Sequence, residues 1–466
     1  MQGDNKSLKR STNNWLLQID SPFIRTEPSP MKFCSYSLDE ENYLVTCSPE
    51  GYVTTGGRNS TKYDPPFGVY WMAADGRLEL LAWDPTTCCC QQVPVLKRTV
   101  PPMKPSPVKW QEKSGSYYLQ DVYIGEPMKG IERGTAKKIR VVGIEFRAAD
   151  VLYGSNVGEV GPSHSRTPVS INNGSWDVKH VLGEVKIELD GSAYFEAPAR
   201  TPLYFQVLDN NGCVIATMRS WSTLQPGELF SCIGCHEDKL QTYPNAGANS
   251  IAMKKPIQKL QPSPGRSVEP SRYGSPDSVS SYLGINSAKG QKGPFAGFSY
   301  PREVQPIWDR HCISCHDGNL HNGKSVPLNL TGNVGSYTLD QCPHNGDRTQ
   351  NALRDFSVSY LQLTNYGHGG PLVNWIGAQT RPTLLPPRFA GSVKSNLMKY
   401  LDGSHYKASL TETEKRTVAC WIDLCVPFCG SYTEANQWTA EQKKTYEYFE
   451  QKRERLAAEE LKANRE

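Results

Sequence analysis

The sequence contains no run of about 18 apolar residues, the length that a membrane-spanning helix needs. It also has no strong excess of one charge, because 51 basic residues stand against 47 acidic ones, for a formal net charge of +4. Proteins that bind nucleic acid usually carry a pronounced basic excess. We therefore expect neither a membrane span nor a nucleic-acid partner. A Ser-His-Asp signature and a phosphate-binding glycine loop are absent as well.

One motif, in contrast, occurs twice. Residues Cys232–His236 and Cys312–His316 both read Cys-x-x-Cys-His, the spacing used for covalent attachment of a c-type haem. The two thiols bond to the vinyl groups on one edge of the porphyrin, and the following His reaches the iron. A zinc or redox site is the alternative, but a zinc site would need a second Cys or His pair nearby, and neither motif has one. The sequence thus predicts two covalently attached haem c groups.

For the first haem we expect thioether bonds to Cys232 and Cys235 and an iron bond from His236. The sequence leaves the sixth ligand open. The candidates are His164, His180, Met218 and Met253. If none of them binds, the iron keeps an open position for a small molecule such as nitric oxide or a peroxide.

For the second haem, Cys312 and Cys315 are the expected thioether sites and His316 is the expected iron ligand. The preferred sixth ligand is His405, which lies 89 residues further on (405 − 316). The alternative is that His405 is a surface-loop residue. The rival ligands are Met398 and His368. A His/His pair would give a lower reduction potential than a His/Met pair, since a thioether favours reduced iron.

Cysteine content and haem chemistry together predict the compartment. Fourteen cysteines are typical of an oxidising space, and c-type haems are attached outside the cytoplasm. The first residues, Met1–Leu8, nevertheless lack the apolar centre of a signal peptide. We therefore expect a periplasmic or other extracytoplasmic protein, of which this chain is an N-terminally truncated part.

Short strands at hairpin spacing predict a β-rich N-terminal half. Strands expected at 43–47, 68–72 and 78–83, the last two joined by an Asp-Gly turn, are similar to one propeller blade. Since a propeller needs roughly four to eight blades, we expect a partial β-propeller; an independent small β-domain is the alternative. A β-sandwich-like middle domain is predicted from further strands at 138–146, 183–189, 193–195, 203–208 and 213–218.

Two helical patterns predict an α-helical, cytochrome c-like C-terminal domain. Residues 304, 307, 308 and 311 lie on one helical face that leads into Cys312. On that face, His311 is expected to pack against the porphyrin or a neighbouring helix. A capping box at Thr411–Glu414 begins the second helix. The predicted organisation is a disordered segment 1–30, a partial β-propeller 31–100, a middle domain 101–243 carrying the first haem, a linker 244–300, a cytochrome c-like domain 301–435 carrying the second haem, and a charged helical tail 436–466.

The segments around both motifs resemble the alpha subunit of hydrazine synthase and the wider family with that architecture. These segments are Asp190–Pro198, Arg219–Glu237, Val304–His316 and Trp421–Phe428. The resemblance covers about residues 31–435. It implies a propeller, a middle domain with one haem and a C-terminal cytochrome c domain with another. It also implies redox partner proteins or other subunits of a complex.

The resemblance also carries expectations about chemistry. In hydrazine synthase the middle-domain haem is the catalytic one, a Tyr four residues after the motif His supplies its proximal oxygen ligand, and that His is free to bind zinc. Here the fourth residue after His236 is Leu240, and the nearest Tyr is Tyr243. The departure argues against hydrazine synthesis and favours ligation by His236, with Tyr243 as the alternative.

Three functions follow from the sequence. The preferred one is electron transfer by a dihaem c-type cytochrome. The alternative is a haem-dependent oxidoreductase similar to hydrazine synthase, in which the middle-domain haem acts on a small nitrogen or oxygen species and the C-terminal haem relays electrons. The third is a scaffold whose propeller docks a partner.

Overall fold

A computed structural model describes residues 31–48, 67–84, 89–97, 106–145, 169–171, 174–175, 177–238, 240–243, 249–263, 297–335, 356–364, 372–377, 382, 384–406, 408–432 and 440–464. The chain divides into two compact units, residues 1–104 and 105–466. The segment 1–30, most of the predicted linker, and the candidate ligands His164 and His368 lie outside the described residues. No described helix has the length and apolar character needed to cross a bilayer.

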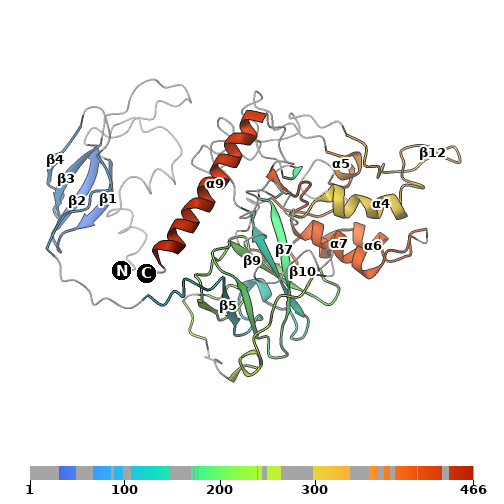
Figure 1. The fold of residues 1–466 in the computed structure, drawn as a ribbon, viewed down its shortest axis with the longest axis horizontal. Helices are drawn as coiled ribbons and strands as arrows, with labels where there is room; N and C mark the ends of the chain where they lie inside the picture. The colour runs from blue at the N-terminus through green and yellow to red at the C-terminus, as the bar shows by residue number, and fades with distance from the viewer. Residues whose placement is uncertain are drawn as a thin grey trace. The chain divides into compact units, whose positions relative to one another are not determined.

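The first unit contains one antiparallel sheet whose strands follow chain order (Figure 1). The strands are β1 (Met31–Ser37), β2 (Asn42–Ser48), β3 (Gly68–Ala73) and β4 (Leu78–Ala82). The three strands predicted here are confirmed. Gly76 has a φ of 93° in the β3–β4 turn, a conformation that suits glycine. An up-and-down sheet of four strands is the topology of a propeller blade, and membership of a propeller stays a prediction.

Two further sheets make up the β-rich part of the second unit. One has the order β10-β9-β6-β7 and the other β11-β5-β8. In chain order the strands are β5 (Ser114–Leu119), β6 (Lys138–Ile144), β7 (Lys179–Lys186), β8 (Ala193–Pro198), β9 (Leu203–Leu208), β10 (Val214–Thr217) and β11 (Leu229–Cys232). The five strands predicted here all exist; β7 begins four residues before its predicted start and ends three residues before its predicted end (183 − 179 and 189 − 186).

These two sheets share one apolar core. Ile139 and Leu203 of the first sheet and Tyr117 and Phe195 of the second belong to the same buried cluster. The ring of Tyr117 lies 4.8 Å from that of Phe205, across the core, in an edge-to-face contact. Because both sheets bury their inner faces against each other, this region is a sandwich.

Part of the segment predicted as a linker packs on the sandwich. Residues 249–263 are described, and isolated bridges join Gln258 to Phe195 of β8 and Gln261 to Glu184 of β7. The Ser263 hydroxyl donates to the Glu184 carboxylate at 2.6 Å. Through these contacts, residues 249–263 extend the edges of the sandwich. The segment contains the short helix η4 (Ala252–Lys254).

Helices occupy the C-terminal part of the second unit. They are the π-helix η8 (Tyr300–Val304), α4 (Gln305–His311), α5 (Val358–Thr364), the 3-10 helix η10 (Ser392–Lys394), α6 (Leu397–Tyr400), α7 (Glu412–Asp423) and α9 (Ala440–Ala463). A two-stranded hairpin of β12 (Leu320–His321) and β13 (Lys324–Ser325) follows α4. Figure 1 shows α4, α6 and α7 gathered beside the sheet that contains β7, β9 and β10.

Both predicted helices are confirmed with their burial patterns. The buried residues of the predicted face are Ile307 and Trp308 of α4 and Val304, which ends η8. At the start of α7 the Thr411 hydroxyl accepts from the Glu414 N–H at 3.2 Å, and the Glu414 carboxylate accepts from the Thr411 N–H at 2.8 Å. This reciprocal pair is the predicted capping box.

One large core joins the sandwich to the helices. Val142 and Tyr204 of the sandwich share a buried cluster with Tyr300, Trp308 and Trp421. The rings of Tyr300 and Trp421 lie 5.0 Å apart, and the Trp308 indole donates to the Tyr300 hydroxyl at 3.0 Å. The chain is therefore β-rich, with several sheets and few helices, and the sandwich and helices bury a common core.

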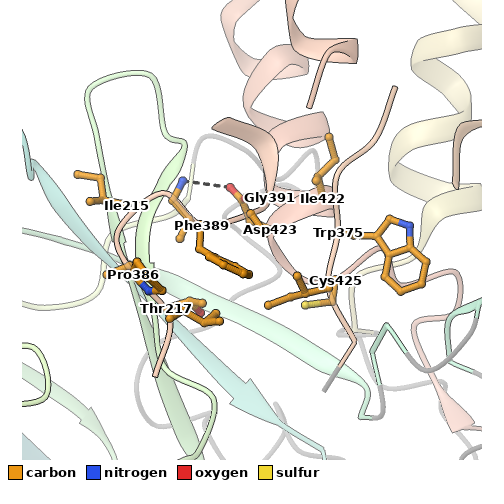
Figure 2. Close-up of a pocket in the computed structure, with 14 residues that line it drawn as sticks. Ile215, Thr217, Trp375, Pro386, Phe389, Gly391, Ile422, Asp423 and Cys425 are labelled. Atoms are coloured by element: carbon orange, nitrogen blue, oxygen red, sulfur yellow. Dashed lines mark hydrogen bonds between the residues drawn. The ribbon is translucent and has the colours of Figure 1, made fainter. Parts of the chain in front are cut away.

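A buried carboxylate crosses this junction. Asp423, at the end of α7, accepts from the Ser392 N–H at 2.7 Å, the Ser392 hydroxyl at 2.8 Å and the Val214 N–H of β10 at 3.2 Å. Figure 2 shows Asp423 among the residues that line a pocket, together with Ile215 and Phe389. Gln206 of β9 donates to the Asp423 carbonyl at 2.8 Å. Asp423 also borders a small cavity of about 40 Å³ whose other walls are mainly apolar.

Burial is the main cause of the shifted pKa of the Asp423 carboxyl group. It raises the pKa of Asp423 to about 6 from 3.8, against the lowering effects of the Ser392 hydrogen bonds and the Arg140 guanidinium. The folded chain then binds the Asp423 proton more tightly than the unfolded chain does. The stability that this proton contributes is present below pH 3.8 and is lost as the pH rises through about 6.

We predict that Asp423→Asn changes the pH dependence of unfolding. The amide keeps the shape and one acceptor but cannot titrate, so the wild-type chain should lose stability relative to the variant between roughly pH 4 and pH 7. About two pKa units at 1.36 kcal/mol each set the size at up to about 3 kcal/mol. Urea unfolding of both chains across this range measures it. A stability difference that does not change with pH would contradict the raised pKa of Asp423.

Candidate haem attachment sites

The first motif is held by backbone pairing at a sheet edge. Strand β11, which ends at Cys232, pairs in parallel with β5. Beyond β5 the chain continues alongside the motif: Gln120 N–H donates to the Cys232 carbonyl at 2.9 Å, and Cys235 N–H donates to the Ile124 carbonyl at 2.8 Å. The motif loop is thus tied to residues 120–124 of the sandwich.

Two glycines allow this close approach. A Cβ on Gly125 would lie 2.2 Å from the Cys235 carbonyl oxygen and 2.8 Å from that of His236. A Cβ on Gly234 would lie 2.2 Å from the Ile124 carbonyl oxygen. Gly125 also has a φ of 115°, which side-chain-bearing residues rarely adopt. Both positions require glycine for the two backbones to touch.

The reactive groups of the first motif differ in exposure. Cys232 and Cys235 are free thiols and partly buried, and burial raises their pKa values to about 11 and about 12. Both thiols are therefore protonated at neutral pH. His236 is exposed, has a φ of 63° and makes no hydrogen bond to a described residue. Exposed apolar side chains flank the motif in the sequence; they are Leu229, Phe230 and Leu240.

The second motif begins where α4 ends. Cys312 N–H donates to the Trp308 carbonyl at 2.8 Å, and the Cys312 carbonyl accepts from Cys315 at 3.1 Å and from His316 at 2.9 Å. The motif therefore forms one backbone turn at the end of α4. The preceding His311 is half-buried, and its Nε2 lies 3.1 Å from Glu414 of α7, a contact with a neighbouring helix.

The imidazole of His316 is oriented by two carbonyl groups. Its Nδ1 lies 2.9 Å from the Pro327 oxygen and 3.2 Å from the Leu328 oxygen. Carbonyl oxygens only accept, so Nδ1 carries a proton, and Nε2 is the ring nitrogen left to bind a metal. Metal-bound histidines are commonly oriented in this way. Leu328 has a φ of 70°, so the backbone is strained where these carbonyls meet the imidazole.

The imidazole rings of His405 and His316 are neighbours in a stacked arrangement. The two ring centroids are 6.0 Å apart, with planes 29° from parallel. A metal–imidazole bond is about 2 Å long and the ring centre lies roughly 1 Å behind the nitrogen, so one ion between two imidazoles separates the centroids by about 6 Å. His405 sits in a turn closed by a bridge between Asp402 and Ser409 and by a hydrogen bond from Ala408 N–H at 2.8 Å.

These observations test whether the residues fit a haem. At the second site, two free thiols, the His316 imidazole and the neighbouring His405 imidazole are the types of donor that a covalently bound haem needs, since the porphyrin supplies the other nitrogens. At the first site the thiols and the exposed His236 match the proximal half of that set. Across the described parts of the chain, no three His, Cys, Asp or Glu side chains converge as a candidate metal site.

The other described sixth-ligand candidates are engaged or exposed. His180 is buried, and its Nε2 lies 3.0 Å from the Glu145 carboxylate. Met218 and Met398 pack against the large core, and Met253 is 37% exposed. The alternative ligand Tyr243 accepts from the Asp238 N–H at 3.2 Å, so its hydroxyl lies close to the first motif.

Sequence reasoning missed two features of these sites. The carbonyls of Pro327 and Leu328 are main-chain atoms with no side-chain signature. Gly125 lies 107 residues before Cys232 (232 − 125), and only the parallel pairing of β11 with β5 brings the two segments together. No strand was predicted at β5 (Ser114–Leu119), and nothing in the sequence linked Gly125 to the motif.

We predict that Gly125→Ala disrupts the first site. The added Cβ meets the Cys235 carbonyl in a strained backbone conformation, which costs roughly 1–3 kcal/mol, and haem attachment at Cys232 and Cys235 should fall. Gly130→Ala is the matched control, because Gly130 also has a positive φ, of 76°, but a Cβ there meets nothing within 4 Å. Intact mass reports the haem count of each variant. Equal haem loading in both variants would contradict the proposed contact.

The first of these two sites lies in a region that is similar to a known protein family. The family model for the hydrazine synthase alpha subunit middle domain matches residues 134–237, so its match ends just after the first motif. The curated hydrazine synthase subunit alpha of Kuenenia stuttgartiensis is 24% identical over 248 residues, which is 47% of this chain and 29% of that protein. The chain therefore spans less than a third of the relative's length.

The fold comparison covers more of the chain. The solved structure of Kuenenia stuttgartiensis hydrazine synthase superposes with a TM-score of 0.55 at 16% identity, over 87% of this chain and 56% of that chain. At this identity the likeness concerns the fold. Together, the sequence match across 134–237 and the shared fold support one identification: the chain is hydrazine synthase alpha-like.

Proposed function

We propose that this protein is a dihaem c-type cytochrome that transfers electrons in the periplasm. Cys232 and Cys235 would bind one haem and Cys312 and Cys315 the other, with His236 and His316 as the iron ligands. The haem iron, when bound, supplies one-electron redox chemistry. The protein's part is to hold the iron ligands and to set the surroundings of each porphyrin.

The stacked pair of His316 and His405 carries this proposal. Its 6.0 Å separation and the hydrogen bonds at His316 Nδ1 suit a ligand on each side of one iron. An iron with two protein ligands has no open position for a substrate, so such a site favours electron transfer over catalysis. His405, in this proposal, is the sixth ligand of the second haem.

The first site favours a second candidate function. Of the described sixth-ligand candidates, His180 is bonded to Glu145, and Met218 packs in the large core. An iron at His236 without a sixth protein ligand would keep an open position. In that case the first haem would act on a small nitrogen or oxygen species, and the second haem would relay electrons to it.

The proposal extends to partners. The relative with the sequence match is named as a subunit, so other subunits of a complex, or soluble redox proteins, are the expected partners. The propeller remnant proposed for residues 31–100 would provide a surface for such contacts, since its meander has two edge strands, β1 and β4.

Replacing Cys312 and Cys315 by Ser should remove one haem and leave the other. Covalent attachment requires the thiols, and the second site packs on α4 rather than on the strand that carries the first. Intact mass and the absorption spectrum, after expression in a host that assembles c-type cytochromes, count the haems. Cys90→Ser, at an exposed free cysteine outside both motifs, should keep two. Two haems in the double variant would contradict haem attachment at Cys312 and Cys315.

Electron paramagnetic resonance of the oxidised protein decides between the two functions. Two low-spin signals support a carrier, and one high-spin signal that changes with nitric oxide supports a catalytic first haem. His405→Ala should convert the second haem to high spin. His311→Ala should not, because His311 contacts Glu414. An unaltered spectrum for His405→Ala would assign the sixth ligand elsewhere.

A further inference from the structure

Two tyrosine rings bracket the His405 imidazole. The ring of Tyr400, the last residue of α6, lies 5.4 Å from it at an interplanar angle of 75°. The ring of Tyr406 lies 4.9 Å away at 88°. Both contacts are edge-to-face, the arrangement in which aromatic rings attract one another. Each ring therefore opposes rotation of the imidazole plane.

The backbone at Tyr406 is unusual for an exposed residue. Tyr406 has a φ of 46°, in the left-handed region that bulky residues avoid. Its side chain is 90% exposed, so burial in the core does not explain why the chain adopts this conformation. With this backbone conformation, the Tyr406 ring lies against the His405 imidazole. Strain of this kind is common at functional sites.

The imidazole planes of His405 and His316 are close to parallel. The planes of His316 and His405 differ by 29°. His316 is fixed by the Pro327 and Leu328 carbonyls, whereas the His405 ring makes no hydrogen bond to another described residue. The relative angle of the two rings is then controlled on the His405 side by its aromatic neighbours.

We infer that Tyr400 and Tyr406 are positioning residues for the distal ligand of the second haem, and that Tyr406 holds the His405 plane near that of His316. The inference rests on the proposed function, since it concerns a bound haem. Near-parallel imidazoles act on the same iron d orbital, and crossed imidazoles act on two. The angle therefore controls the anisotropy of the low-spin signal and contributes to the reduction potential.

The test uses the full chain with both haems attached. Wild-type protein should give a rhombic low-spin signal from the second haem. Tyr406→Phe keeps the ring and should match it. Tyr406→Ala should keep two haems and low spin but give a more anisotropic signal and a shifted midpoint potential. Tyr406→Gly should behave like the Ala variant and also relieves the backbone strain, so it serves if Tyr406→Ala folds poorly.

Tyr448→Ala is the matched control, because Tyr448 is 56% exposed on α9 and should leave signal and potential unchanged. If both Tyr406→Ala and Tyr406→Gly carry two low-spin haems with wild-type signal and potential, the positioning role is wrong and the proposed function stands. If the wild-type chain carries no haem, or if His405→Ala leaves the second haem low-spin, the proposed ligation fails first and this inference falls with it.

Discussion

The packing of Trp308 with Tyr300 and Trp421 is the contact on which the second site depends. Trp308 lies on α4, whose end leads into His316, and Trp421 lies on α7, which follows the His405 turn. Both indoles are almost completely buried in the same cluster. Because interiors are close-packed and resist small displacements, the spacing of the two imidazoles is set by a core that neither histidine enters.

The two motifs share a sequence pattern but are built in different ways. The first motif begins at the end of strand β11 and is held by backbone contacts that only glycine permits at Gly125 and Gly234. The second is a turn at a helix end, where side-chain packing and two carbonyls orient His316. The first arrangement leaves its imidazole exposed, and the second pairs it with another. This asymmetry supports different roles for the two sites.

The junction between sandwich and helices is polar as well as apolar. Asp423 and Gln206 connect the end of α7 to β9 and β10, inside a region where Arg140 is also buried. Buried polar groups are costly unless all their hydrogen bonds are made, so this network specifies one way of joining the two parts. Both motifs thereby belong to one compact unit, residues 105–466.

The sequence by itself determined the two Cys-x-x-Cys-His motifs, the buried face of α4, the capping box at Thr411 and most strands, because each depends on local spacing or periodicity. It also supplied the resemblance that the comparisons support. Only the tertiary structure decided that the His405 ring stacks beside that of His316, that the Pro327 and Leu328 carbonyls orient His316, and that Asp423 joins α7 to the sandwich. These contacts join residues distant in the chain or use main-chain atoms, so they depend on how the whole core packs and leave no local pattern.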